Sequence, residues 1–308
     1  MIAIKWLVSS QRYLKTVLVN KLCLGSVQWG SKYGVSNTNG QTSVDEVSKI
    51  LKEARLNGIQ FIDTASGYGN AENILGNSDL SSFSIITKTP NFEKDIIKKF
   101  DADKLINEFK QSLEKLNLSS CYGLLLHHKE DVFKSGYENI IFALNDLKSR
   151  GLVEKIGVSI YDSDRINEVI EKLKPDIIQL PLNVLDQRVI QNGTLKYLKS
   201  INVEIHVRSI FLQGLLIMPY ENLPPYFNTW LDRLNDWKKV CLEKKMSSVE
   251  AALNFVINQR DVDYCIIGTE NLKQLKQCIL AAKSDQKVNV SELATEDTKL
   301  INPVNWKI

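Results

Sequence analysis

Three side chains that can donate, accept or stabilise a proton stand directly after short apolar runs. They are Asp63 after residues 59–62, Lys88 after 83–87 and His127 after 122–126. Asp63 also opens the segment Asp-Thr-Ala-Ser-Gly-Tyr-Gly, which places Tyr68 five positions further on in a glycine-rich turn. A carboxylate, an ammonium, an imidazole and a phenol that meet at one place can perform general acid–base chemistry.

An Asp63–Lys88 ion pair at neighbouring strand ends would have a clear purpose if it acted on Tyr68. An ammonium beside a phenol favours the phenolate, so we expect Lys88 to lower the Tyr68 pKa from about 10. Tyr68 would then exchange protons near neutral pH, and His127 would orient a substrate carbonyl. Each residue also has an ordinary explanation: a helix-capping Asp, a solvated Lys and a loop His.

The segments that must position these residues alternate between short apolar runs and stretches of helical period. Residues 44–56, 105–116 and 137–148 are predicted helices, and Ser43 and Gly58 are start and stop signals around the first. Eight such pairs without a linker favour a single closed (β/α)8 TIM barrel over two doubly wound domains, and no Gly-x-Gly-x-x-Gly turn follows an early strand. The predicted strands are 22–24, 59–63, 83–88, 121–127, 153–159, 176–181, 203–208 and 263–267.

We expect one domain over residues 1–308, with an N-terminal extension or hairpin at 1–20, the barrel at 21–285 and a C-terminal tail at 286–308. Two features interrupt the regular alternation. An extended loop follows the seventh strand at 209–225, and two helices, 226–245 and 247–259, precede the eighth, which is one helix more than the repeat needs. Such an insertion belongs on the loop side of a barrel, where binding surfaces form.

The composition favours a small-molecule partner. Hydrophobic residues make up 44% of the chain, and a net charge of +3 over 308 residues indicates neither nucleic acid nor a membrane surface as partner. The cysteines are odd in number and lack metal-site spacing, so we expect no disulfide framework, no metal and a cytoplasmic location. They are Cys23, Cys121, Cys241, Cys265 and Cys278.

The polar residues belong to longer motifs whose order resembles the aldo-keto reductases, NAD(P)-dependent enzymes built on a (β/α)8 barrel. The resemblance covers roughly residues 21–285 and implies that Tyr68 is the general acid, Lys88 tunes it, Asp63 pairs with Lys88, and His127 positions the carbonyl. His128 is the rival for the last role, but the family motif places the imidazole directly after the strand. The motifs are Leu-Gly-Ser-Val-Gln-Trp-Gly at 24–30, Phe-Ile-Asp-Thr-Ala-Ser-Gly-Tyr-Gly at 61–69, Ile-Thr-Lys at 86–88, Leu-Leu-Leu-His at 124–127, Ile-Gly-Val-Ser at 156–159 and Ile-Gln-Leu-Pro-Leu-Asn at 178–183.

The same resemblance implies hydride transfer between a nicotinamide and a carbonyl or alcohol. Ser159 and Gln179 would contact the nicotinamide carboxamide with Asn183 nearby, although Ile160 stands where the family often has Asn, and residues 209–214 would bind the pyrophosphate. The cofactor-binding set implied in this way is Gly25, Gln28, Trp29, Asp63, Ser159, Gln179, Ser209, Phe211, Leu212, Gly214, Gly268, Thr269 and Gln274.

The adenosine end departs from relatives that prefer NADPH. Those relatives carry Lys or Arg near the turn at 268–271, whereas this chain has Glu270 and Gln274, and a carboxylate repels a 2′-phosphate. Lys273 and Lys276 either compensate or are solvated surface residues. The expected cofactor is NADPH or NADH, with NADH accepted at least as well.

The substrate is harder to define. Trp29, Tyr33 and Tyr68 would line its site, and the runs 179–188 and 207–216 resemble a bacterial branch linked to surface-polysaccharide sugars, which favours a keto-sugar or nucleotide-sugar. Lys129 is either a surface residue or a positive charge near an acidic substrate. Two alternatives stay open: a cofactor-binding sensor or regulatory subunit, and an aldolase that uses Lys88 in a Schiff base.

Overall fold

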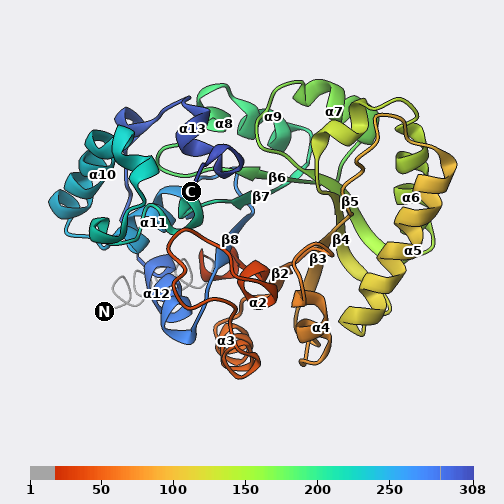
Figure 1. Ribbon diagram of the computed structural model, residues 1–308, viewed down its shortest axis with the longest axis horizontal. Helices are drawn as coiled ribbons and strands as arrows, with labels where there is room; N and C mark the ends of the chain where they lie inside the picture. The colour runs from red at the N-terminus through yellow and green to blue at the C-terminus, as the bar shows by residue number, and fades with distance from the viewer. Residues whose placement is uncertain (1–17, 285) are drawn as a thin grey trace, which may run out of the picture.

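The computed structural model describes residues 18–284 and 286–308. Eight parallel strands close into a barrel in chain order, β1 to β8, and Figure 1 shows the helices arranged around them. This confirms the predicted (β/α)8 barrel. The strands are β1 Leu22–Gly25, β2 Phe61–Asp63, β3 Ser84–Lys88, β4 Cys121–Leu126, β5 Val153–Ser159, β6 Ile177–Pro181, β7 Glu204–Arg208 and β8 Tyr264–Gly268.

The helices follow the strands as the apolar periodicity predicts. The Ser43 side chain accepts a hydrogen bond from the Glu46 amide and caps α3, and Gly58 adopts a positive φ of 77° just after the helix. The helices are α2 Val27–Gly30, α3 Val44–Leu56, α4 Ala71–Gly76, α5 Lys99–Leu116, α6 Glu138–Ser149, α7 Ile166–Leu173, α8 Arg188–Gln191, α9 Thr194–Ser200, α10 Leu231–Lys244, α11 Ser248–Ile257, α12 Leu272–Ala282 and α13 Thr298–Ile301.

The region between β7 and β8 has the predicted extra helix, α10, ahead of α11. The stretch after β7 contains short 3₁₀ turns, which are Leu212–Gly214, Tyr220–Asn222 and Pro225–Trp230. The C-terminal segment packs on the barrel, because Leu300 and Ile301 are buried and Trp306 contacts the core. Most of the 1–20 extension lies outside the described residues.

The strand register brings the carboxyl ends of the strands to one edge. Gly25 pairs with Asp63 across β1 and β2, Ser159 pairs with Gln179 across β5 and β6, and Arg208 ends β7 beside β6. The predicted strand-end residues therefore share the edge of a barrel where enzymes of this fold carry their active sites.

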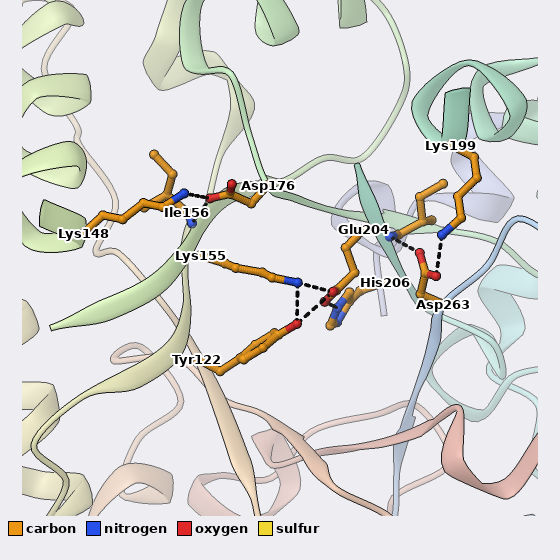
Figure 2. A network of polar contacts seen from close by, with 10 residues as sticks. Tyr122, Lys148, Lys155, Ile156, Asp176, Lys199, Glu204, His206 and Asp263 are labelled. Carbon is orange, nitrogen blue, oxygen red and sulfur yellow. Dashed lines mark hydrogen bonds and ion pairs between the residues drawn. The ribbon is translucent and has the colours of Figure 1, made fainter. Parts of the chain in front are cut away.

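The opposite end of the barrel holds a polar network shown in Figure 2. Glu204 accepts hydrogen bonds from Lys155 Nζ at 2.5 Å and from the Tyr122 hydroxyl at 2.8 Å, and it lies 2.6 Å from His206 Nε2. Phe61 packs edge-on against the Tyr122 ring. No helix within residues 18–284 and 286–308 is long and apolar enough to cross a membrane.

Candidate active site

Lys88 and Asp63 form a buried ion pair. Lys88 Nζ donates to Asp63 Oδ2 at 2.6 Å and to the Thr64 carbonyl at 2.8 Å, and the two charged residues are only 2% and 4% exposed. Burial favours loss of the Lys88 proton, but Asp63 and Tyr68 outweigh it, so the Lys88 pKa lies above its ordinary value. Lys88 is therefore a fixed positive charge at neutral pH.

Tyr68 lies over this pair. Lys88 Nζ is 5.0 Å from the centroid of the Tyr68 ring, and the tyrosine faces the cavity described below. Burial raises the Tyr68 pKa and outweighs the lowering effect of Lys88, so the pKa lies above its ordinary value. The expectation that Lys88 brings this pKa below about 10 is wrong, because the phenol is too deeply enclosed. Tyr68 is consequently protonated near neutral pH.

His127 follows β4 and presents its ring to Tyr68. The two ring centroids are 6.1 Å apart in an edge-on arrangement, and the His127 amide donates to Thr89 Oγ1 at 3.3 Å. Burial, followed by the Lys88 charge, lowers the His127 pKa to about 3. The imidazole is therefore neutral at physiological pH and has one ring N–H to donate. His128 stacks on His127, with its centroid 5.1 Å away.

A chain of hydrogen bonds extends from this pair across the strand ends. Gln179 Nε2 donates to Asp63 Oδ1 at 2.7 Å, and Ser159 Oγ donates to Gln179 Oε1 at 3.2 Å. Arg208 Nε is 3.4 Å from Ser159 Oγ and completes the chain. The polar chain thus holds side chains of β2, β5, β6 and β7 in fixed positions around Tyr68.

Two glycines set the backbone on which Tyr68 stands. A Cβ on Gly30 would lie 1.7 Å from the Tyr68 carbonyl oxygen, and one on Gly69 would lie 2.3 Å from the Gly30 carbonyl oxygen. Gly69 also has a φ of 56°, in the region that favours glycine. The last residue of α2 therefore packs directly against the Tyr68 turn, which explains the glycine at both positions.

A cavity of about 1060 Å³, including its open mouth, extends from Asp63 and Tyr68 to the start of α12. Its mixed polar and apolar walls are those of a site for a small-molecule ligand. The predicted site residues on its wall are Gly25, Gln28, Asp63, Tyr68, Gln179, Ser209, Phe211, Gly214, Gly268 and Gln274.

Other predicted residues lie behind the wall. Trp29 is fully buried, and its Nε1 donates to the Thr269 carbonyl at 3.1 Å, so the indole supports the cleft from beneath. Leu212 is also buried, and Asn183 uses its amide to bind the Ser209 carbonyl at 3.1 Å. Lys88, His127 and Ser159 adjoin the cavity through the contacts described above.

Ser36 and Arg208 also line the cavity but were not in the predicted site, whereas Gln213 belongs to the predicted segment 209–214. Gln213 Nε2 donates to the Tyr33 hydroxyl at 3.2 Å, and a Cβ on Gly214 would lie 1.8 Å from Ser36 Oγ. The loop after α2 therefore meets the loop after β7. Arg208 could have been noticed in the sequence as a charged residue at the last position of a strand.

Gln28 and Gly268 lie against each other on the cavity wall. Gln28 Oε1 is buried there without a hydrogen-bond partner among the described residues. Gly268 approaches the same side chain so closely that a Cβ would lie 2.6 Å from Gln28 Nε2. The wall therefore offers polar groups and bare backbone, as a ligand with several hydrogen-bonding groups requires.

Glu270 and Gln274 stand at the far end of the cavity. The Glu270 amide donates to Gln274 Oε1 at 2.7 Å, and burial raises the Glu270 pKa above its ordinary value. Lys273 and Lys276 are exposed, and Lys276 lies 3.8 Å from Glu53. Neither lysine lines the cavity, which agrees with the interpretation of both as solvated surface residues.

The surroundings of Lys129 differ from both interpretations that the sequence suggested, a surface residue and a charge beside the substrate. It is 9% exposed, forms an ion pair with Asp162 and donates to the Asp164 carbonyl at 3.1 Å. It is thus neither a surface lysine nor a free positive charge for a substrate, because the loop after β5 neutralises it.

Comparison with known proteins agrees with this geometry. The sequence model of the Aldo/keto reductase family matches residues 21–294. The chain is 25% identical over 277 residues to the NADH-specific methylglyoxal reductase of Escherichia coli, covering 79% of this chain and 84% of that protein. It is also 25% identical over 178 residues to a glyoxal reductase of Bacillus subtilis, covering 56% and 61% of the two chains. An aldo-keto reductase structure from Bacillus halodurans in its holo form superimposes with a TM-score of 0.72 at 20% identity, covering 89% and 92%.

The closed parallel barrel holds the buried Asp63–Lys88 pair beside Tyr68 at the wall of a cavity. The chain belongs to the aldo/keto reductase family, whose members are NAD(P)H-dependent oxidoreductases.

Proposed function

We propose that this protein reduces a carbonyl compound with a reduced nicotinamide cofactor and that Tyr68 is the proton donor. The observation that carries the proposal is the position of the protonated Tyr68 phenol, between the Lys88–Asp63 pair and the His127 ring at the cavity wall. The bound nicotinamide would supply the hydride. Gln179, with Ser159 hydrogen-bonded to it, would hold the nicotinamide, and Gly268 would lie at the adenosine end of the cofactor.

The side chains have separate tasks in this proposal. Neutral His127 donates a hydrogen bond to the substrate carbonyl oxygen, and Tyr68 gives that oxygen its proton as negative charge develops there. Lys88 stabilises the phenolate that remains, and Asp63 keeps Lys88 charged and in place. Since the Tyr68 pKa is raised, the resting phenol is ready for the reductive direction.

We propose a sugar-derived carbonyl, a keto-sugar or nucleotide-sugar of polysaccharide biosynthesis, as substrate class. The runs 179–188 and 207–216 support it by their resemblance, and Tyr33 and Phe211 line the cavity as aromatic walls for a sugar. The names of the relatives favour a second candidate, a small 2-oxoaldehyde. All five cysteines are free thiols, which supports the proposed cytoplasmic location.

NADH is the proposed cofactor. Glu270 on the cavity wall would face the 2′-phosphate of NADPH, and the E. coli relative is by name NADH-specific. We expect Glu270→Gln to tighten NADPH binding about tenfold or less and to change NADH binding little, because one unfavourable charge is removed. Fluorescence titration with both nucleotides measures this, and Lys273→Gln, at an exposed position nearby, is the control. Wild-type protein that binds NADPH much more tightly than NADH would contradict the preference.

The function as a whole is tested by following NADH and NADPH absorbance with a panel of carbonyls. The panel contains methylglyoxal, simple aldehydes, keto-sugars and nucleotide-linked keto-sugars. We expect turnover with at least one of them and the highest kcat/KM with a sugar carbonyl. Binding of neither nucleotide would contradict the oxidoreductase assignment, whereas nucleotide binding without any turnover would favour a sensor or regulatory protein.

A further inference from the structure

Arg208 brings a positive charge to the catalytic end of the cavity. It is the last residue of β7, it is half-buried, and it lines the same cavity as Tyr68 and Asp63. Burial dominates the pKa shifts of Tyr68 and His127, and the Arg208 guanidinium also acts on both groups. Its charge therefore reaches the place where a substrate carbonyl would be held.

The guanidinium makes hydrogen bonds only to neutral acceptors. Nε lies 3.4 Å from Ser159 Oγ, Nη1 donates to Ser209 Oγ at 3.2 Å, and Nη2 donates to the Ile160 carbonyl at 2.9 Å. These bonds use three of its five N–H groups. No carboxylate in the part of the chain that the structure describes forms an ion pair with it.

Other cations around the mouth of the barrel are neutralised by partners. Lys88 pairs with Asp63, Lys129 pairs with Asp162, and Arg188 forms two 2.8 Å hydrogen bonds to the Asp186 carboxylate. Arg208 differs from these three, because no described carboxylate pairs with it and two of its five N–H groups make no hydrogen bond to a described residue. A partly desolvated guanidinium in this state is a binding site for an anion.

The guanidinium is also held rigidly. Its central carbon lies 4.2 Å from the centroid of the Tyr161 ring, and the Tyr161 carbonyl accepts a hydrogen bond from Arg188 Nη2 at 3.1 Å. Tyr161 follows Ile160, the position where the sequence departs from the usual asparagine of the family. Stacking and hydrogen bonds thus fix the plane of the guanidinium before any ligand arrives, which lowers the entropy cost of binding.

We propose that Arg208 is the carboxylate-binding residue of the substrate site, so that the preferred substrate is a carbonyl compound that also carries a carboxylate, such as an acidic sugar. The inference rests on the proposed reductase function and narrows its substrate class. The two oxygens of a carboxylate match two N–H groups of a guanidinium. The hydrogen-bond chain from Arg208 through Ser159 and Gln179 to Asp63 fixes the distance of the guanidinium from the proposed catalytic groups. The phosphates of the cofactor are expected further along the cleft, at 209–214.

The test compares matched acidic and neutral substrates of the full-length protein with NADH. The pairs are 4-oxobutanoate with its methyl ester, and D-glucuronate with D-glucose. We expect the wild type to have a higher kcat/KM for the acid in each pair. Arg208→Gln should reduce the acid-to-neutral ratio of kcat/KM about tenfold to a hundredfold, mainly through KM, because a charge-assisted hydrogen bond is lost. Arg208→Lys should restore part of the ratio, and Arg150→Gln, on the exposed end of α6, should leave it as in the wild type.

The outcomes separate this inference from the proposed function. Equal wild-type activity on acid and neutral partners, or an equal loss for both in Arg208→Gln, would overturn the carboxylate site while the reductase function stands. A weaker NADH affinity in Arg208→Gln with an unchanged ratio would assign Arg208 to the cofactor and also overturn it. A wild type that binds nucleotide but reduces no carbonyl would overturn the proposed function, and this inference with it.

Discussion

Each of the proposed catalytic residues owes its protonation state to its neighbours. Lys88 keeps its proton because Asp63 and Tyr68 outweigh burial, whereas His127 loses its proton because burial and the Lys88 charge act together. Tyr68 keeps its proton because enclosure outweighs the nearby ammonium. Tyr68 is therefore a neutral acid and His127 a neutral hydrogen-bond donor on either side of the expected carbonyl oxygen. The Lys88 cation lies beneath them.

The Lys88–Asp63 pair allows stability and catalysis to be separated. Lys88→Met leaves the buried Asp63 carboxylate without its cation, so we expect the free energy of unfolding to fall by about 3 kcal/mol or more. In the double variant Asp63→Asn with Lys88→Met, the unpaired charge is gone and much of that stability should return. Activity should not return, since no cation remains under Tyr68. Urea unfolding and steady-state turnover measure the two properties, and a double variant that recovers both would contradict the role of Lys88.

At the level of elements, the sequence predicted the barrel well, because each strand is a short apolar run and the apolar residues of the predicted helices recur at helical spacing. The helix 44–56 and all eight strands were found within about two residues of their observed bounds. The start of α5 was missed by six residues, because four of the six, residues 99–104, are charged and show little apolar period. Local caps and periodicity therefore fixed the elements, and the parallel register fixed which of their ends meet.

The candidate site was only partly predictable from the sequence. Asp63, Lys88, Tyr68 and His127 could be found because each stands at a strand end or turn. The bond from Gln179 to Asp63 joins two strands, and the stacking of Arg208 on Tyr161 joins β7 to the loop after β5, so no local pattern indicates them. Likewise, the burial of Trp29 depends on α2 packing against the turn after β8, which single-sequence reasoning does not reveal.

The packing of α2 against the Tyr68 turn gives a prediction for these two elements. Gly30→Ala would place a Cβ 1.7 Å from the Tyr68 carbonyl oxygen, so the Tyr68 turn must move. We expect kcat/KM to fall about a hundredfold, as small displacements of a catalytic group cause. Gly67→Ala, in the same turn but with open space around its Cβ, should stay within about threefold of the wild type. Equal activities of the two variants would show that this close approach does not position Tyr68.

At the scale of the whole molecule, the proposed catalytic groups and a hydrogen-bonded polar network lie at opposite ends of the barrel. The carboxyl ends of the strands carry the cavity and the tetrad of Asp63, Tyr68, Lys88 and His127. The amino ends carry the network around Glu204, where Lys155, Tyr122 and His206 meet one carboxylate. This separation lets the mouth keep an unpaired cation such as Arg208 while the floor is fully hydrogen-bonded at its central carboxylate.

The Glu204 network predicts part of the acid sensitivity of the fold. Burial raises the Glu204 pKa, but hydrogen bonds from His206 and Lys155 outweigh it and lower the pKa to about 2 from an ordinary value of 4.5. A carboxylate whose pKa is lowered by folding stabilises the protein above its unfolded pKa, and this contribution is lost as the pH falls from about 4.5 toward 2. Glu204→Gln should therefore be less stable than the wild type at pH 7, and the difference should shrink below about pH 4.

Urea unfolding at a series of pH values measures this effect, with Glu154→Gln, at an exposed position of β5, as the control. A difference between Glu204→Gln and the wild type that stays constant from pH 7 to pH 3 would mean that Glu204 titrates alike in the folded and unfolded chains.

The central claim is that Tyr68 delivers the proton during hydride transfer, and single-turnover kinetics test it most directly. Wild type and Tyr68→Phe are each saturated with NADH and mixed in a stopped-flow instrument with the best carbonyl of the panel. NADH affinity should agree within about twofold, because the ring is retained, while the rate of NADH oxidation in Tyr68→Phe should fall at least about a hundredfold. A variant that oxidises NADH as fast as the wild type would show that Tyr68 is not the proton donor.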